Sequence, residues 1–227
     1  MLKAIIFDFN GVICNDEPIH QSAMQKVLEE EGIVVLLEDY LSTYLGRDDR
    51  DCFRIALQQS GRSVSAGIIA SLIQRKSLYY HQSIRQSLEV FPGVISFIQR
   101  ANQHYELAVA SGALRGEIEF VLERLALRNR FRCVISSHEI EKGKPEPDIF
   151  LKALEGINLS RNHHGLILPG DCLVIEDSQA GIKAALAAGM KCLAVTNTYS
   201  SAELAAAHQV VPSLEMNPVC LQSLFSD

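Results

Sequence analysis

The chain has 227 residues, of which 48% are apolar and 21% are charged, and its formal net charge is -6 at pH 7. This balance is typical of a globular protein and excludes a largely disordered one, and the absence of a basic block argues against a nucleic-acid partner. No apolar run could span a bilayer, and a carboxylate occurs too early for a signal peptide, so we expect a cytoplasmic protein without a membrane partner. The six cysteines form no CxxC pair, which favours neither a zinc site nor a disulfide framework.

The first predicted element is a buried strand over residues 4–8, because AIIFD shows no alternation with polar residues. Almost a hundred residues separate it from the next strand, too many for one crossover connection. That interval holds the helical patterns HQSAMQKVLEEEG, DDRDCFRIALQQSG and SAGIIASLIQRKSLYYHQSI and no convincing strand. We therefore expect an inserted helical cap domain at 15–88, and a core domain formed by residues 1–14 and 89–227.

From about residue 92 onward, short apolar runs alternate with helical patterns. The predicted strands are 106–110, 132–135, 172–176, 192–195 and a short edge strand at 209–211. The helical patterns cover 116–127, 147–157 and 178–189, the last ending at a glycine as a helix stop should. This alternation predicts an α/β core with a doubly wound, Rossmann-like parallel sheet.

Polar side chains close four of the predicted strands. They are Asp8 and Asn10 after the first strand, Ser111 after the second, Lys144 in the loop beyond the third, and Glu176 with Asp177 at the fourth. Ligands of open parallel sheets bind at the carboxyl ends of the strands, so these side chains should converge. Three carboxylates, a hydroxyl and an ammonium suit phosphoryl transfer, in which a divalent cation screens the phosphate from an anionic nucleophile.

Within this set, we expect Asp8 to attack phosphorus and to become an aspartyl phosphate. Asp8 and Asp177 are the expected direct ligands of Mg²⁺, which prefers hard oxygen atoms. Lys144 would face the phosphoryl oxygens, and Ser111 with neighbouring backbone N–H groups, such as that of Gly112, would donate hydrogen bonds to them. Each residue alone could have a structural role in a helix cap or a solvated loop. Their joint occurrence in strand order favours the site.

The pattern of these residues resembles the motifs of the haloacid dehalogenase superfamily. Within it, the resemblance is to the subgroup of phosphatases and β-phosphoglucomutases that has a helical cap after the first strand. The resemblance covers nearly the whole chain and rests on DFNGV, the strand end at Ser111, KPEPD around Lys144, and EDSQAGIKAALAAGM. It implies that the Asn10 backbone carbonyl binds Mg²⁺, and that Glu176 supports the ion directly or through water.

The resemblance extends to the predicted cap. The DEPIH stretch with His20 and the LGRDDR loop with Gly46 and Arg50 are similar to the cap entrance and substrate loop of the subgroup, which implies contacts with the substrate. Outside the resemblance, His163 and His164 follow a polar turn and are expected at the surface.

The chain departs from the family at Asn10, where the family carries an aspartate that serves as general acid and base. An amide cannot exchange a proton, and loss of such a group typically costs about 100- to 10,000-fold in rate. Three interpretations follow. The chain is a natural phosphatase whose substrate has a good leaving group or which uses another proton carrier, it is a weakened or non-catalytic protein, or it is an engineered variant. His20 is a candidate substitute acid or base, with a hinge or substrate hydrogen bond as the alternative role.

The leading functional hypothesis is an Mg²⁺-dependent phosphatase of a small phosphorylated metabolite, such as a sugar phosphate. A β-phosphoglucomutase-like mutase is the second, and it depends more on the acid and base that Asn10 lacks. A phosphate-binding protein without catalysis is the third. A dehalogenase is disfavoured because halide displacement gives no reason for the Glu176 and Asp177 pair. The sequence does not predict the substrate or the oligomeric state.

Overall fold

The computed structural model describes residues 1–161 and 165–226, so His163 and His164 lie outside the described residues. The chain divides into two compact units. One comprises Met1–Asn15 and Val90–Asp227, and the other comprises Asp16–Glu89.

The first unit contains a six-stranded sheet in the order β3-β2-β1-β4-β5-β6, with every neighbouring pair parallel. The strands are β1 (Ala4–Phe7), β2 (Glu106–Ala110), β3 (Cys133–Ile135), β4 (Cys172–Glu176), β5 (Lys191–Val195) and β6 (Gln209–Val211). This confirms the predicted parallel α/β sheet, with strand bounds within one residue of expectation. One small correction concerns Asp8, which follows β1 and does not belong to it.

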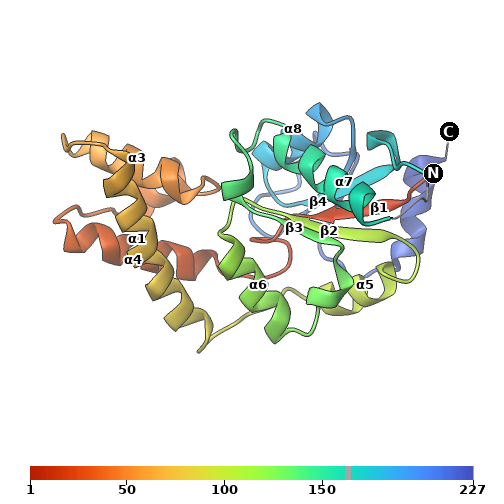
Figure 1. The fold of residues 1–227 in the computed structure, drawn as a ribbon, viewed down its shortest axis with the longest axis horizontal. Coiled ribbons are helices and arrows are strands. Elements are labelled where there is room, and N and C mark those ends of the chain that lie inside the picture. The colour runs from red at the N-terminus through yellow and green to blue at the C-terminus, as the bar shows by residue number, and fades with distance from the viewer. Residues whose placement is uncertain (162–164, 227) are drawn as a thin grey trace. The chain divides into compact units, whose positions relative to one another are not determined.

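Helices cover both faces of this sheet, as Figure 1 shows, with α5 and α6 on one side and α7 and α8 on the other. Their bounds are α5 (Val94–Ala101), α6 (Arg115–Arg124), α7 (Asp148–Ser160) and α8 (Gln179–Ala187). The helix expected over 116–127 ends earlier, because Ala126 adopts a positive φ of 55° that a right-handed helix excludes. Short 3₁₀ turns occupy Arg128–Arg130, Ser137–Glu139 and Pro169–Asp171, and a longer 3₁₀ helix occupies Pro218–Phe225.

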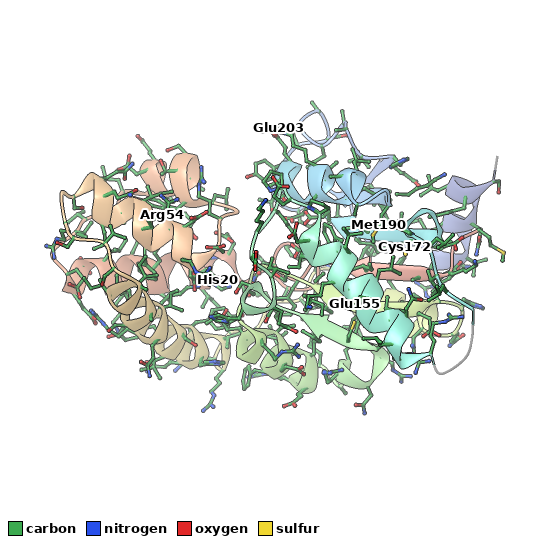
Figure 2. All side chains as sticks on the ribbon, turned by 45° about the horizontal axis from the view of Figure 1, so that its top comes forward. His20, Arg54, Glu155, Cys172, Met190 and Glu203 are labelled. Carbon is green, nitrogen blue, oxygen red and sulfur yellow. The ribbon has the colours of Figure 1, made fainter. Side chains whose placement is uncertain are left out.

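The core of the first unit explains why its strands read as unbroken apolar runs. All four residues of β1 are buried, since helices cover the sheet on both sides. The cluster beneath α7 and α8 includes Phe150, Val174, Cys172 and Met190, the last two labelled in Figure 2. Each fully buried large side chain of this kind contributes roughly 1.5–3 kcal/mol to folding. This packing holds the strand ends rigidly, and with them the polar residues that follow.

The second unit is helical and has its own core. It consists of α1 (Glu17–Glu30), α2 (Leu37–Asp39), a π-helical turn (Tyr40–Tyr44), α3 (Asp49–Gln59) and α4 (Ala66–Ile84). Its described residues contain no strand, which confirms the helical insertion after the first strand. Asp48 and Ser65 cap α3 and α4 by accepting hydrogen bonds from backbone N–H groups. None of the described helices combines the length and apolar character needed to cross a membrane.

Candidate active site

The central strands bring the predicted side chains to one edge of the sheet. The strand order reverses between β1 and β4, because β2 and β3 lie beside β1 whereas β5 and β6 lie beyond β4. Asp8 directly follows β1, Ser111 directly follows β2, and Glu176 is the last residue of β4. Ligands of open parallel sheets bind at such a reversal point, outside the carboxyl ends of the strands. The fold therefore gathers these side chains where a ligand is expected.

Lys144 lies between two of the carboxylates. Its Nζ is 2.8 Å from Asp8 Oδ1 and 2.5 Å from Glu176 Oε1. Asp8 is 7% exposed and Glu176 is 0% exposed, so water screens neither ion pair effectively. The alternative of a solvated loop charge for Lys144 is therefore wrong, since its ammonium is directed at the candidate nucleophile.

Glu176 has both carboxylate oxygens engaged. Oε1 faces Lys144, and Oε2 accepts hydrogen bonds from Asp177 N at 2.9 Å, Ser178 N at 2.8 Å and Ser178 Oγ at 2.9 Å. A methyl group on Gly181 would lie 1.8 Å from Oε1, so the first turn of α8 leaves room only for glycine there. Glu176 thus joins the end of β4 to the start of α8 while it holds Lys144, which favours support of a cation through charge or through water.

Burial and like charge raise the pKa values of two of the carboxylates, Asp8 and Asp177. Burial raises the pKa of Asp8 to about 6, against the lowering effect of Lys144. Burial, followed by the negative charges of Glu176 and Asp8, raises the pKa of Asp177 well above its usual value. Burial lowers the pKa of Lys144, but the charges of Asp8 and Glu176 outweigh this effect and raise it. Three ionised carboxylates would carry more negative charge than Lys144 can neutralise, so full ionisation of the cluster is favoured only when a further cation is present.

The residues present fit an Mg²⁺ ion. Asp8, Glu176 and Asp177 each offer one carboxylate oxygen, and these atoms lie within 4.8 Å of one another. Asp8 Oδ1 is buried and accepts no hydrogen bond within the described part of the chain, although the Lys144 ammonium lies nearby. Hard oxygen atoms at this spacing, with an excess of negative charge, are what Mg²⁺ prefers. The acidic triad could thus hold the predicted metal.

Asn10 occupies the tight loop after β1. The Ser111 hydroxyl donates to Asn10 Oδ1 at 3.2 Å and accepts from the Ala113 backbone N–H at 3.3 Å. Ser111 is buried, so this link between the ends of β1 and β2 is shielded. The same hydrogen bond would suit a carboxylate of the same shape. The site thus keeps the geometry for an acid at position 10 while it carries a group that transfers no proton.

Two residues that were not predicted from the sequence, Asn197 and Thr198, also contact this site, and both follow β5. Asn197 Nδ2 donates to the Gly11 carbonyl oxygen at 2.7 Å. The Thr198 hydroxyl donates to Asp177 Oδ2. The signal was available, because the polar TNT run at 196–198 follows a predicted strand just as the other candidates do.

His20 lies on α1, in the helical unit, and is labelled in Figure 2. Its Nε2 is 3.2 Å from Asp16 Oδ2, and its Nδ1 pairs with the buried Lys76 ammonium. An ammonium only donates, so Nδ1 is the acceptor and Nε2 carries the proton. Lys76 also contacts Asp49, at 2.7 Å. These bonds within the unit favour an anchoring role for His20, and its proton exchange or substrate contact stays a prediction.

The other residues that were expected to contact the substrate are Gly46, Arg50 and Gly112, and the structure describes the local conformation or exposure of each. Gly46 adopts a positive φ of 77° in the turn between the π-helical segment and α3. Arg50 is exposed in the first turn of α3, and Gly112 is exposed directly after Ser111. Their contacts with a substrate stay predictions.

The raised pKa values predict that Mg²⁺ affinity depends on pH. The folded-state pKa of Asp8, about 6, lies above its ordinary 3.8, so the metal-free protein loses stability from this group as pH rises between those values. Binding of Mg²⁺ requires ionised carboxylates, so affinity should rise with pH, by up to about tenfold per pH unit for each carboxylate that loses a proton, and level off only when both Asp8 and Asp177 are ionised. Isothermal titration with Mg²⁺ at several pH values between about 5 and 8 measures this. An affinity that is constant across this range would contradict the expectation.

Comparison with known proteins gives a consistent picture. Residues 5–195 match the family model described as haloacid dehalogenase-like hydrolase. Protein CbbY of Rhodobacter capsulatus is 27% identical over 221 residues, covering 94% of this chain and 94% of that protein. The phosphorylated carbohydrates phosphatase of Thermotoga maritima is 28% identical over 196 residues, covering 84% and 83%. Protein SUPPRESSOR OF QUENCHING 1 of Arabidopsis thaliana is 29% identical over 89% of this chain, which spans only 19% of that longer protein.

Solved structures share the fold. The β-phosphoglucomutase of Clostridium difficile superposes with a TM-score of 0.86 at 24% identity, covering 99% of this chain and 97% of that one. A mutant CbbY of Rhodobacter sphaeroides, in which asparagine replaces an aspartate, superposes with a TM-score of 0.83 at 22% identity, covering 95% and 96%. That mutant was solved in complex with xylulose-(1,5)bisphosphate.

Proposed function

Because the chain belongs to the haloacid dehalogenase-like hydrolase family, whose model matches residues 5–195, we propose that it is an Mg²⁺-dependent phosphatase of a small phosphorylated sugar or related metabolite. The observation that carries this proposal is the buried Lys144 ammonium between Asp8 and Glu176, at the strand reversal point and beside Asp177. A nucleophilic carboxylate beside a fixed cation and a candidate metal triad is the arrangement that phosphoryl transfer requires.

In the proposed reaction, an oxygen of Asp8 forms a bond to phosphorus as the bond from phosphorus to the ester oxygen breaks. The products are an aspartyl phosphate and the leaving-group anion, and an alkoxide leaving group takes its proton from solvent water. Lys144 faces the phosphoryl oxygens, and the Gly112 N–H donates a hydrogen bond to them, as does the Ser111 hydroxyl once it turns from Asn10 Oδ1 to the substrate. Asp8, Asp177 and the Asn10 carbonyl, with Glu176 in support, would hold Mg²⁺, which would neutralise charge on the phosphate. Water then attacks the phosphorus of the aspartyl phosphate, which releases inorganic phosphate and regenerates Asp8.

Asn10 determines which substrates suit this mechanism. The leaving alcohol needs a proton, and an amide does not provide one. Substrates whose leaving group is stable as an anion, such as acyl phosphates, depend least on the missing acid. In the proposed function, such substrates are therefore hydrolysed faster than alkyl phosphates.

Relatives support a phosphorylated sugar as the substrate class. The Thermotoga maritima relative is a phosphorylated carbohydrates phosphatase, and the mutant CbbY is in complex with a sugar bisphosphate. In that mutant an asparagine replaces an aspartate, so an asparagine-bearing member of this fold still binds such a ligand. This observation also favours a second candidate function, in which Asn10 leaves the chain a phosphate-binding protein with little turnover.

The test measures release of inorganic phosphate from a panel of sugar phosphates, other alkyl phosphates and acyl phosphates, with Mg²⁺ and with a chelator. Mg²⁺-dependent release, largest for the acyl phosphates, is expected. Appearance of an isomeric sugar phosphate without release would assign the mutase function in its place. Binding of phosphorylated sugars without release or isomerisation would assign the binding function.

A further inference from the structure

We propose that Asn197 and Thr198, in the loop after β5, are positioning residues that lock the Gly11 turn and the Asp177 carboxylate into the geometry that binds Mg²⁺. The inference rests on the proposed function, because it concerns the same metal site. It adds two uncharged residues from a fifth strand end to a site so far described with residues from the ends of β1, β2 and β4 and the loop after β3.

The Gly11 turn and Asp177 lie in direct contact. Gly11 adopts a positive φ of 73°, and a Cβ built on it would lie 1.9 Å from Asp177 Oδ2 and 3.0 Å from Thr198 Oγ1. No side chain fits at position 11, so the backbone of the turn packs against the carboxylate. Rotation of the Asp177 side chain toward this turn is therefore blocked, and a further partner is needed only to prevent rotation away from it.

Thr198 supplies that restraint. Its hydroxyl donates to Asp177 Oδ2, the same oxygen that lies against the Gly11 turn. A carboxylate held at one oxygen presents its other oxygen in a fixed direction, which is the preorganisation that a metal ligand needs. The threonine side chain suits this role, because branching at Cβ restricts rotation of its hydroxyl.

Asn197 restrains the turn itself. Its amide donates to the Gly11 carbonyl oxygen at 2.7 Å, and the Gly11 N–H donates to the Cys14 carbonyl oxygen at 3.1 Å. The Asn10 carbonyl and the Gly11 N–H share one planar peptide unit and point in opposite directions. Fixing Gly11 at both its N–H and its carbonyl therefore fixes the direction of the Asn10 carbonyl, the proposed backbone ligand of the ion.

The loop that carries both residues is anchored where it leaves the sheet. The Thr196 N–H donates to the Val211 carbonyl oxygen at 3.1 Å, which continues the pairing of β5 with β6. Asn197 and Thr198 are the next two residues, so their backbone position is set by the sheet pairing of Thr196. Both side chains are uncharged, and their contribution is orientation of the ligands and not charge.

The experiment compares the full-length protein with Thr198→Val, which keeps the shape of the side chain and removes the hydroxyl, and with Thr198→Ser, which keeps the hydroxyl. Asn197→Ala forms a second arm. The matched controls are Asn102→Ala, which removes an amide bond to the Arg130 carbonyl oxygen, and Thr43→Val, at an exposed hydroxyl in the helical unit. Mg²⁺ affinity is measured by isothermal titration, and the Mg²⁺ concentration for half-maximal rate is measured separately from the rate at saturating Mg²⁺.

Loss of an outer partner of a metal ligand typically costs about 10- to 100-fold in metal affinity. We expect this loss for Thr198→Val and Asn197→Ala, recovery of most of it in Thr198→Ser, and no change in either control. Most of the rate should return at saturating Mg²⁺, which a general loss of structure would not allow. Thr198 is exposed apart from its bond to Asp177, so its replacement should leave folding intact. If Thr198→Val nevertheless fails to fold, the Asn197→Ala arm decides the question in the same way.

Each failure has its own signature. Unchanged Mg²⁺ affinity in the folded variants overturns this inference and leaves the proposed function standing. Mg²⁺ binding that weakens as expected in a protein that hydrolyses neither phosphate esters nor acyl phosphates overturns the proposed function and supports the inference. A parent protein that binds no Mg²⁺ overturns both.

Discussion

Replacing Asn10 by aspartate is expected to raise the rate of hydrolysis of alkyl phosphates by about 100- to 10,000-fold, the usual contribution of a general acid and base. The structure is prepared for this change, because the Ser111 hydroxyl already donates to Asn10 Oδ1 and would donate equally to a carboxylate oxygen. The backbone carbonyl at position 10 is unchanged by the substitution, so the proposed metal ligand survives. Release of inorganic phosphate under saturating Mg²⁺ measures the effect.

The dependence of this gain on the leaving group is the sharper result. Alkyl phosphates need protonation of the departing oxygen, whereas acyl phosphates do not, so Asn10→Asp should accelerate the former far more. Asn217→Asp is the matched control, because it adds the same charge at a side-chain oxygen that accepts from the Val219 N–H at 3.1 Å. Equal acceleration of both substrate classes, or a gain below about tenfold on alkyl phosphates, would show that a missing acid does not limit this chain.

Asp8→Asn is expected to abolish turnover, with a loss of roughly 10,000-fold or more, as removal of a catalytic nucleophile typically causes. The amide has the shape of the carboxylate, so the change removes the charge and the nucleophilic oxygen with little change in packing. Lys144 keeps its ion pair with Glu176 at 2.5 Å, which should hold the ammonium in place. Phosphate release, with mass spectrometry of the acid-quenched protein for a phosphoryl adduct, measures the outcome.

The matched control for Asp8→Asn is Asp171→Asn. Asp171 also pairs with a lysine, since Lys3 Nζ lies 2.8 Å from its Oδ2, but it precedes β4 and so lies at the opposite end of the strands. This variant should keep the rate of the parent protein. Turnover within about tenfold of the parent in Asp8→Asn, or a phosphoryl adduct that persists in it, would exclude Asp8 as the nucleophile.

Much of the fold followed from local pattern. A strand buried on both faces reads as an unbroken apolar run, and a helix on its surface reads with apolar residues three and four apart, so β1 to β6 and α6 to α8 were visible in the sequence. The site residues at the ends of β1, β2 and β4, and Lys144 beyond β3, followed from the rule that ligands bind at strand ends. The sequence also predicted a departure from the family at Asn10, because an amide cannot exchange a proton, and this departure stays a prediction.

Pairings between distant residues depended on the tertiary structure. Asn197 meets the Gly11 carbonyl across 186 positions, and Lys144 meets Glu176 across 32, and no local pattern encodes either contact. The structure likewise decided that both oxygens of Glu176 are engaged, and that His20 is held between Asp16 and Lys76. The physical reason is that hydrophobic periodicity records which face of an element is buried, whereas a hydrogen bond between loops depends on the strand order and register that bring those loops together.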